Sequence, residues 1–360
     1  MPDWLPALER RPAPSSVMRM AAPLLAALAI TLTALLAFAA LDLSPWSGLY
    51  TFFISPIASA YGVGEWLLKA TPLALCALGL SIAFRANVWN IGAEGQFTAG
   101  AITGGGVALY LAPQLGGAGV PVMLFAGIAG GMLWAAIPAW LRTRFNTSEI
   151  LTSLMLVYVA QLLLAWLMHG HWQDPQGFNY PQSRAFDDAL ILPLLADGQR
   201  ATSAVWMTAL LALATWVLVR WSYAGYRMWV GGEAPAAARY AGFSEARSVW
   251  LGMLISGGAA GLAGIAEVAG PIGRLQTSIS PGYGFAAIIV AFVGRLHPLG
   301  VVLAALLMSL LYLGGEAAQL ELGLPAAVTG IFQGLLLFYL LAADVFTHYR
   351  LRRPPVARPA

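Results

Sequence analysis

Residues 84–97 read FRANVWNIGAEGQF and lie between two long apolar runs. Two Asn, one Glu and one Gln occur here among glycines, where lipid-facing side chains are expected. A carboxylate at membrane depth is costly unless it faces protein or water, so it indicates a functional site. We therefore predict that Asn87, Asn90, Glu94 and Gln96 lie along a substrate pathway. Asn and Gln also hold membrane helices together by hydrogen bonds, and the residue types alone leave both interpretations open.

The composition around this stretch is that of a membrane protein. Of the 360 residues, 59% are hydrophobic and 10% are charged, with a mean hydropathy of +0.73. Soluble domains carry roughly 25% charged residues, so a soluble fold is excluded. The basic residues lie at the ends of apolar runs, where orientation signals occur, and give no indication of nucleic-acid binding. The single cysteine, Cys76, excludes an intrachain disulfide and a cysteine-based metal site, and we predict no metal site of another kind.

The apolar runs predict an all-α polytopic membrane protein with about ten membrane-spanning helices. Residues 1–16 and 347–360 are expected to be cytoplasmic tails, and residues 17–346 to form the membrane domain. A polar insertion, residues 170–200, and a basic loop, residues 220–247, interrupt the apolar runs. The predicted spans are residues 17–41, 66–84, from within the opening stretch to 111, 120–141, 149–168, 201–219, 248–269, 285–293, 299–313 and 326–343.

The distribution of basic residues predicts the orientation of these spans. With ten spans, fifteen of the 19 Lys and Arg residues fall on the side of the two termini. Cytoplasmic loops are the ones that carry an excess of Lys and Arg, so both termini are expected in the cytoplasm and residues 170–200 in the periplasm. Spans two to five and seven to ten have a similar rhythm, which is compatible with an inverted repeat of the kind found in transporters.

Residues 229–244, WVGGEAPAAARYAGFS, predict a short helix in the basic loop. Glu233 lies near its expected start, Pro235 follows early, and Gly242 lies near its expected end, as helix-end statistics favour. The small alanines leave a flat surface, with Arg and aromatic side chains of the types that dominate protein interfaces. The alternative, which periodicity alone favours, is a loop helix resting on lipid. The predicted docking residues are Glu233, Ala236, Ala237, Arg239, Tyr240, Gly242 and Phe243.

Two further observations bear on function. Glu267, near the outer end of the seventh span, is predicted either to lie along the pathway or to pair with Arg274.

The only lysine, Lys69, does not follow a Gly-rich loop of the P-loop pattern, and no catalytic constellation of nucleophile and base is present. We therefore expect a transport protein rather than an enzyme. If transport is driven by ATP, the ATPase is a separate polypeptide that docks on the helix at residues 233–243.

Three stretches resemble one known family. Residues 87–96, NVWNIGAEGQ, resemble the signature of ABC importer permeases for simple sugars and nucleosides, within the branched-chain amino acid and ribose permease group. Residues 236–243, AAARYAGF, match the pattern of that family's cytoplasmic coupling helix. Residues 280–294, which begin SPGYGFAAI, match a third block. The blocks occur in family order, and the resemblance covers nearly the whole chain apart from the tails and residues 170–200.

The resemblance implies a permease subunit in the cell's inner membrane that translocates nucleosides or simple sugars by alternating access. Two permease chains, identical or different, would form the pore, and an extracytoplasmic substrate-binding protein would deliver the substrate. Two cytoplasmic ATPases would use ATP, so this chain is expected to bind no cofactor. The sequence departs from the family pattern at residues 232–235, where Asn is common before the alanines, and in its acidic outer loop.

Two other functions stay open at this point. A branched-chain amino acid permease of the same group would need groups that match a zwitterionic substrate. Glu94 and Glu267 supply negative charge, and the only cations near membrane depth are Arg85 and Arg274 at its borders, which favours neutral polar substrates. A secondary transporter that works without an ATPase would need no docking helix, and Glu94 would be its candidate ion-coupling carboxylate.

Overall fold

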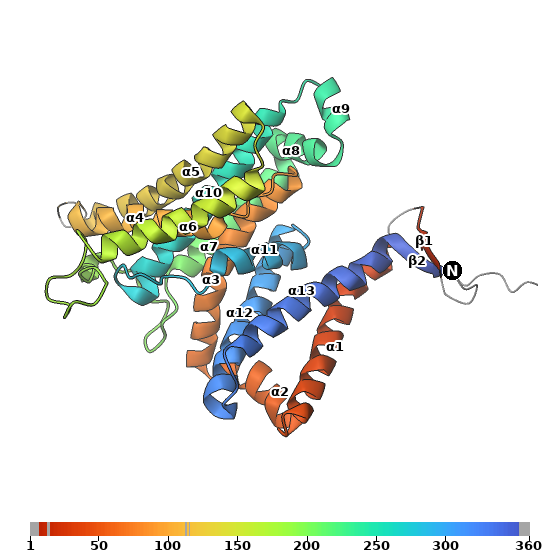
Figure 1. Ribbon diagram of the computed structural model, residues 1–360, viewed down its shortest axis with the longest axis horizontal. Helices are drawn as coiled ribbons and strands as arrows, with labels where there is room; N and C mark the ends of the chain where they lie inside the picture. Colours follow the sequence, from red (N-terminus) through yellow and green to blue (C-terminus); the bar gives the residue numbers. More distant parts are fainter. Residues whose placement is uncertain (1–6, 13–14, 112–113, 115, 353–360) are drawn as a thin grey trace, which may run out of the picture. The chain divides into compact units, whose positions relative to one another are not determined.

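The computed structural model describes residues 7–12, 15–111, 114 and 116–352, which are mostly helical (Figure 1). The chain divides into two compact units, one of residues 57–310 and one of residues 1–56 with 311–360. The larger unit contains α3 (Ala60–Arg85), α4 (Ala93–Tyr110), α5 (Gly119–Phe145), α6 (Glu149–Met168), α7 (Ala204–Trp221), α8 (Tyr223–Glu233), α9 (Pro235–Tyr240), α10 (Glu245–Glu267), α11 (Tyr283–Val293) and the first half of α12 (Pro298–Leu322). The smaller unit contains β1 (Ala7–Arg10), α1 (Ser16–Ala40), α2 (Pro45–Phe53), the rest of α12, α13 (Ala327–His348) and β2 (Tyr349–Arg352).

The predicted helical membrane fold is confirmed, and a helix lies at the position of each predicted span. Within the described part of the chain, seven helices are long and apolar enough to cross a membrane. The apolar part of α1 and the 11-residue α11 are shorter, and α4, which carries Glu94 and Gln96, is not among the seven. The number of ten spans, the side on which the termini lie and the inverted repeat therefore stay predictions.

Helix α10 is the centre of the larger unit, where it packs against α3, α4 and α5 (Figure 1). Glycines allow this close packing. A Cβ atom added to Gly257 or Gly261 would collide with the backbone of α5 at Gly131, and one added to Gly100 would collide with Gly261. Small residues four apart let membrane helices approach until their backbones touch, in the absence of a hydrophobic driving force between helices. The glycine-rich sequence of α10 thus specifies its place at the centre.

The approach of α3 to α10 gives a direct test of this packing. A Cβ atom at Gly79 would lie 2.6 Å from the Cβ of Ala259, so Gly79→Ala is expected to overpack the contact at a typical cost of about 1–3 kcal/mol. The matched control is Gly334→Ala in α13, where an added Cβ meets nothing within 4 Å. We expect a lower thermal unfolding temperature in detergent for the Gly79 variant and an unchanged or higher one for the control. Equal temperatures for the two variants would contradict the close contact.

In the smaller unit, α1 packs along α13, and the two ends of the chain pair with each other. β1 and β2 form an antiparallel ladder in which Glu9 lies opposite Arg350, and the side chains of these two residues form an ion pair of 2.9 Å. The sequence predicted tails here and missed both strands. The ladder places residues 7–10 beside residues 349–352. The outermost parts of the predicted tails, residues 1–6 and 353–360, lie outside the described residues.

The polar insertion at residues 170–200 packs on the stretch that follows α10. Three backbone hydrogen bonds connect the two. The Ser183 N–H donates to the Leu275 carbonyl group at 2.8 Å, and the Phe186 N–H donates to the Gly273 carbonyl group at 2.9 Å. The Leu192 N–H donates to the Ala269 carbonyl group at 2.8 Å. Short bridges and turns, rather than long helices, make up the insertion. Its role was not predicted from the sequence. The hydrogen bonds show that it covers residues 269–276.

Candidate functional site

Asn90 and Gln96 form a closed hydrogen-bond network with Ser256 of α10. The Asn90 Nδ2 atom donates to Gln96 Oε1 at 2.7 Å and to Ser256 Oγ at 2.8 Å, while Gln96 Nε2 donates back to Asn90 Oδ1 at 3.0 Å. The Asn90 Oδ1 atom also accepts from the backbone N–H of Gly92. Both amide side chains are fully buried. In this conformation they join α4 to α10, and their place along a substrate pathway stays a prediction.

Glu94 joins α4 to the N-terminus of α11. Its Oε2 atom accepts a hydrogen bond of 2.7 Å from the backbone N–H of Gly284, and the Ser280 side chain is a second partner. A carboxylate is favourable at this end of a helix, where backbone N–H groups lack helical partners. A Cβ atom at Gly284 would collide with the backbone of Glu94, so only glycine fits there. Residues 87–96 and residues 280–294, two of the three stretches that resemble the family, are therefore in contact.

The stretch between Asn87 and Gly92 is not helical, and side chains of α6 hold its backbone. The Trp89 N–H donates to Glu149 Oε1 and the Ile91 N–H donates to Ser153 Oγ, both at 3.2 Å. Irregular backbone at membrane depth is tolerated where protein satisfies its polar groups. Sequence reasoning missed Glu149 and Ser153. The signal was the position of Glu149 at the very start of a predicted span, a place where a carboxylate would otherwise be unexpected.

Asn87 lies apart from the other predicted pathway residues. It is exposed, has a left-handed backbone with φ of 56°, and its Oδ1 atom accepts from Trp89 Nε1 at 2.9 Å. It lines a cavity of about 60 Å³ together with Pro235, Arg239 and Glu245. The structure therefore brings Asn87 next to the predicted docking helix rather than next to Glu94.

Glu267 lies at the end of α10 that is remote from α9. The positive charges that act on the Glu267 carboxylate are those of Lys69 in α3 and Arg200 in the insertion. The sequence had instead suggested Arg274 as its partner. Arg200 also forms an ion pair of 3.4 Å with Glu65, one helical turn before Lys69. This end of the larger unit thus holds a group of two carboxylates and two cations. A larger apolar cavity of about 540 Å³ between α3, α7 and α12 contains none of the predicted pathway residues.

The predicted docking region is two helices rather than one. α8 ends at Glu233 and α9 begins at Pro235, because the backbone at Ala234 leaves the helical region with φ of −140° and ψ of 72°. Glu233, which was predicted near the start of the docking helix, is the last residue of α8 and lies two residues before α9 begins. The prediction of the docking helix's end was right, since α9 ends at Tyr240 and Gly242 follows with the left-handed φ of 76° that glycine favours.

The side chains predicted to face a partner separate into two groups. Ala236, Ala237, Arg239 and Gly242 are exposed, and 97% of Tyr240 is exposed. Phe243 instead packs back on α8, at 6.1 Å from Tyr223 and 6.3 Å from Tyr226 between ring centroids, with the Arg227 guanidinium over its ring. α9 thus projects from the end of the larger unit (Figure 1), and Phe243 fastens it to α8.

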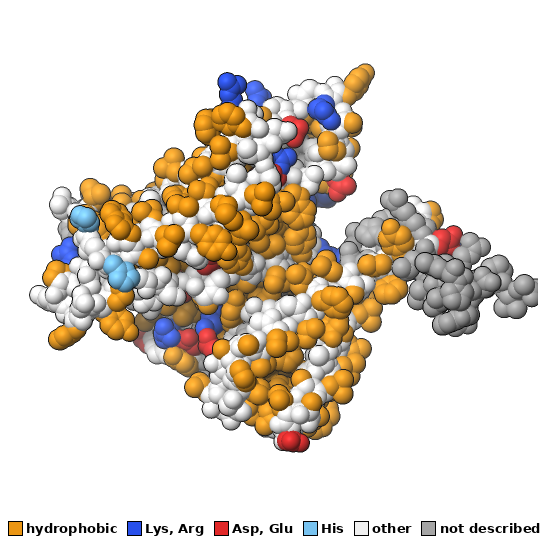
Figure 2. All heavy atoms as spheres, in the orientation of Figure 1, with side chains coloured by type: hydrophobic (Ala, Val, Ile, Leu, Met, Phe, Trp, Pro, Cys, Tyr) orange, Lys and Arg blue, Asp and Glu red, His pale blue; other side chains and the backbone are white. Residues whose placement is uncertain are grey.

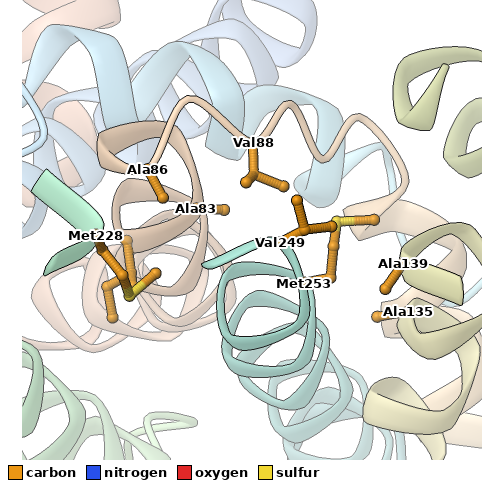
Figure 3. Packing of buried hydrophobic residues seen from close by; sticks show 9 residues of the cluster. Ala83, Ala86, Val88, Ala135, Ala139, Met228, Val249 and Met253 are labelled. Carbon is orange, nitrogen blue, oxygen red and sulfur yellow. The ribbon is translucent and has the colours of Figure 1, made fainter. Parts of the chain in front are cut away.

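A buried apolar cluster lies beneath these helices (Figure 3). Met228 of α8 packs there with Ala86 and Val88 from the connection between α3 and α4, and with Val249 and Met253 of α10. The backbone of α8 also lies against α3, because a Cβ atom at Gly232 would collide with the Arg85 carbonyl group. α8 is therefore in contact with the start of the stretch that carries Asn87, Asn90 and Glu94.

The described residues contain no group of three His, Cys, Asp or Glu side chains that is placed to hold a metal ion.

Basic side chains gather over the end that carries α8 and α9, while hydrophobic side chains cover the flanks of the helices (Figure 2). The basic residues of this end include Arg142, Arg144, Arg227, Arg239 and Arg247. The surface is thus arranged as expected for a membrane protein with a cytoplasmic end at α8 and α9.

Comparison with known proteins identifies the family. The model of the family described as branched-chain amino acid transport system / permease component matches residues 62–341. The chain is 37% identical to the glucose ABC transporter permease protein of Haloferax volcanii, over 91% of this chain and 88% of that protein. It is 28% identical to the guanosine ABC transporter permease protein of Bacillus subtilis, over 83% of this chain and 84% of that protein. It is also 28% identical to a nucleoside ABC transporter permease protein of Lactococcus lactis, over 82% of this chain and 84% of that protein. No solved structure matches the chain significantly. The chain therefore belongs to the family of ABC transporter permeases described as the permease component of branched-chain amino acid transport systems.

Proposed function

We propose that this chain is the membrane-spanning permease subunit of an ABC importer that translocates nucleosides or simple sugars across the inner membrane. The relatives named for glucose, guanosine and nucleosides support this substrate class over branched-chain amino acids. Two observations together carry the mechanism. Met228 of α8 shares a buried cluster with Val88 of the segment at residues 87–96. Pro235 and Arg239 of α9 line a small cavity together with Asn87 of the same segment. We call residues 87–96 the signature segment below.

The proposal assigns the energy source and the substrate delivery to partners. A cytoplasmic ATPase would dock on α9 and hydrolyse ATP, a second permease chain, identical or different, would complete the pore, and an extracytoplasmic binding protein would deliver substrate. Each partner acts by binding one of two conformations of the helix bundle more tightly, because only a difference in affinity can shift such an equilibrium. Both chain ends, which pair through β1 and β2, would lie in the cytoplasm with α9.

The enclosed polar residues would contribute in two ways. Asn90, Glu94 and Gln96 hold α4, α10 and α11 together in the present conformation and would meet the substrate only when these helices separate. Glu267, in its group of charges with Lys69, Arg200 and Glu65, is our candidate for polar contacts at the extracytoplasmic end of the pathway. Buried polar groups that lose their partners would make the open conformation costly, and ATP and substrate binding would have to offset that cost.

The experiment that tests the proposed function is uptake into vesicles that contain this chain, the second permease chain and the binding protein, with or without the candidate ATPase. Labelled guanosine, ribose, glucose and leucine are the substrates. We expect guanosine or a sugar to accumulate only when both the ATPase and ATP are present. Leucine uptake under the same conditions would favour an amino acid permease. Uptake that persists without the ATPase and follows a proton or sodium gradient would refute the importer and return Glu94 to the role of ion-coupling carboxylate.

A further inference from the structure

Arg142 lies where the ends of three helices meet. It is in the last turn of α5, and its Nη1 atom forms an ion pair with Glu149 Oε1 at the start of α6. Its Nη2 atom lies 3.6 Å from Glu245 Oε1 at the start of α10. The two carboxylates differ in environment, because the Glu149 side chain is 7% exposed and that of Glu245 is 69% exposed. One guanidinium thus spans a buried carboxylate and a solvated one, which the planar fork of Arg allows and the single ammonium of Lys does not.

The buried member of this group holds the signature segment. Glu149 Oε1 accepts the N–H of Trp89, and Ser153, one turn further along α6, accepts the N–H of Ile91. A buried carboxylate that loses its cationic partner is strongly destabilised. The position of Glu149, and with it the backbone of the signature segment, therefore depends on where the Arg142 side chain lies.

The exposed member of the group belongs to the docking region. Glu245 begins α10 five residues after α9 ends, and it lines the small cavity beneath α9 together with Arg142, Pro235 and Arg239. A shift of α9 that displaces the start of α10 would change the distance between the Arg142 guanidinium and the Glu245 carboxylate. The guanidinium would then move toward or away from Glu149.

The signature segment is in turn connected to both ends of α11. At one end Trp89 stacks on Phe292, with ring centroids 5.8 Å apart and an interplanar angle of 25°. At the other end Glu94 accepts the Gly284 N–H. With 11 residues, α11 is roughly 16 Å long, about half the thickness of the apolar core of a membrane. A displacement of the segment would therefore move a half-length helix as one body.

We propose that Arg142 and Glu149 are positioning residues that transmit the movement of α9 to the signature segment and to α11. The inference rests on the proposed function, since it requires an ATPase that moves α9. Neither side chain needs to touch substrate or nucleotide. Their effect is on the fraction of ATP hydrolysis that results in transport.

The test uses the complete transporter in proteoliposomes, with uptake and ATP hydrolysis measured on the same samples. Glu149→Gln removes the charge and keeps an oxygen acceptor, so no unpaired charge is left buried. We expect Glu149→Gln to bind the ATPase and hydrolyse ATP as the unaltered protein does, with uptake per ATP about tenfold lower, a change of about 1.4 kcal/mol in coupling free energy. Arg142→Gln should lower uptake per ATP at least as much and should also lower the unfolding temperature, because it leaves the Glu149 carboxylate buried without its cation. Arg142→Lys should fall between them and the unaltered protein. The matched control is Arg144→Gln, an exposed cation at the same helix end, which should change nothing.

A charge-swapped double variant, Arg142→Glu with Glu149→Arg, separates transmission from simple stability. It restores an ion pair between α5 and α6 but offers the Trp89 N–H no acceptor, because a guanidinium only donates. The new carboxylate at position 142 also lies near Glu245, so the double variant is compared with the same pair of substitutions in a Glu245→Gln background. We expect its unfolding temperature to recover while uptake per ATP stays low. Full recovery of coupling in the double variant, or equal coupling in Glu149→Gln and Arg144→Gln, would overturn the proposal. If the unaltered protein shows no ATP-dependent uptake, the proposed function fails instead.

Discussion

Glu94→Ala is expected to abolish uptake and to lower the amount of folded protein in the membrane. The substitution removes the acceptor of the Gly284 N–H and the partner of Ser280 in a place where water does not reach, since Glu94 is 3% exposed. A buried donor left without a partner costs about 1–3 kcal/mol, and the missing side chain leaves a void as well. α11 would lose the contact that fixes its N-terminus to α4. Uptake normalised to membrane-inserted protein, with thermal unfolding in detergent, measures both effects.

Glu94→Gln is the control that separates structure from charge. The amide oxygen can still accept the Gly284 hydrogen bond, so we expect this variant to fold and to retain most of the uptake that is driven by ATP. If Glu94→Gln folds and yet loses all uptake, the negative charge itself is required, and an ion-coupled mechanism regains support. If Glu94→Ala transports as well as the unaltered protein, the connection between α4 and α11 has no role in transport.

How far the sequence predicts this structure depends on how local the determining interactions are. The fifth predicted span, residues 149–168, coincides with α6 because Glu149 and the polar residues after Met168 mark both ends of an uninterrupted apolar run. The end of α9 was predicted for the same reason, since Gly242 is a local stop signal. The ninth span was placed too short. α12 continues from residue 313 to Leu322, past residues whose polarity suggested a loop.

Distant contacts account for what the sequence did not predict. Glu321 is tolerated near the end of α12 because Thr51 and Ser55 donate hydrogen bonds to it at 3.0 and 3.3 Å. Glu94 and Gly284 are separated by 190 positions, and nothing in either stretch alone indicates that they meet. The residue types in the signature segment therefore marked a special place, while their partners in α6, α10 and α11 became visible only in the fold.

Tyr240→Ala is expected to weaken binding of the ATPase and thereby abolish ATP-driven uptake, while leaving the permease folded. The side chain is 97% exposed on the outer surface of α9, so its removal leaves no cavity and breaks no contact within the chain. Buried aromatic anchors in interfaces typically contribute 2 kcal/mol or more, which corresponds to an affinity loss of roughly 30-fold. Titration of the purified ATPase against the permease in nanodiscs measures this loss directly.

Two further aromatic residues make the test specific to docking. Phe178 in the polar insertion is fully exposed, like Tyr240, but lies in the segment predicted to be periplasmic, so Phe178→Ala should leave ATPase affinity unchanged. Phe243→Ala should lower the unfolding temperature, because Phe243 packs on Tyr223 and Tyr226 and fastens α9 to α8. Tyr240 is the aromatic residue of the six-residue α9, and its exposed side chain is of a type that is common in interface hot spots. If Tyr240→Ala and Phe178→Ala bind the ATPase equally well, α9 is not the docking helix, and the interpretation of a loop helix resting on lipid becomes the better one.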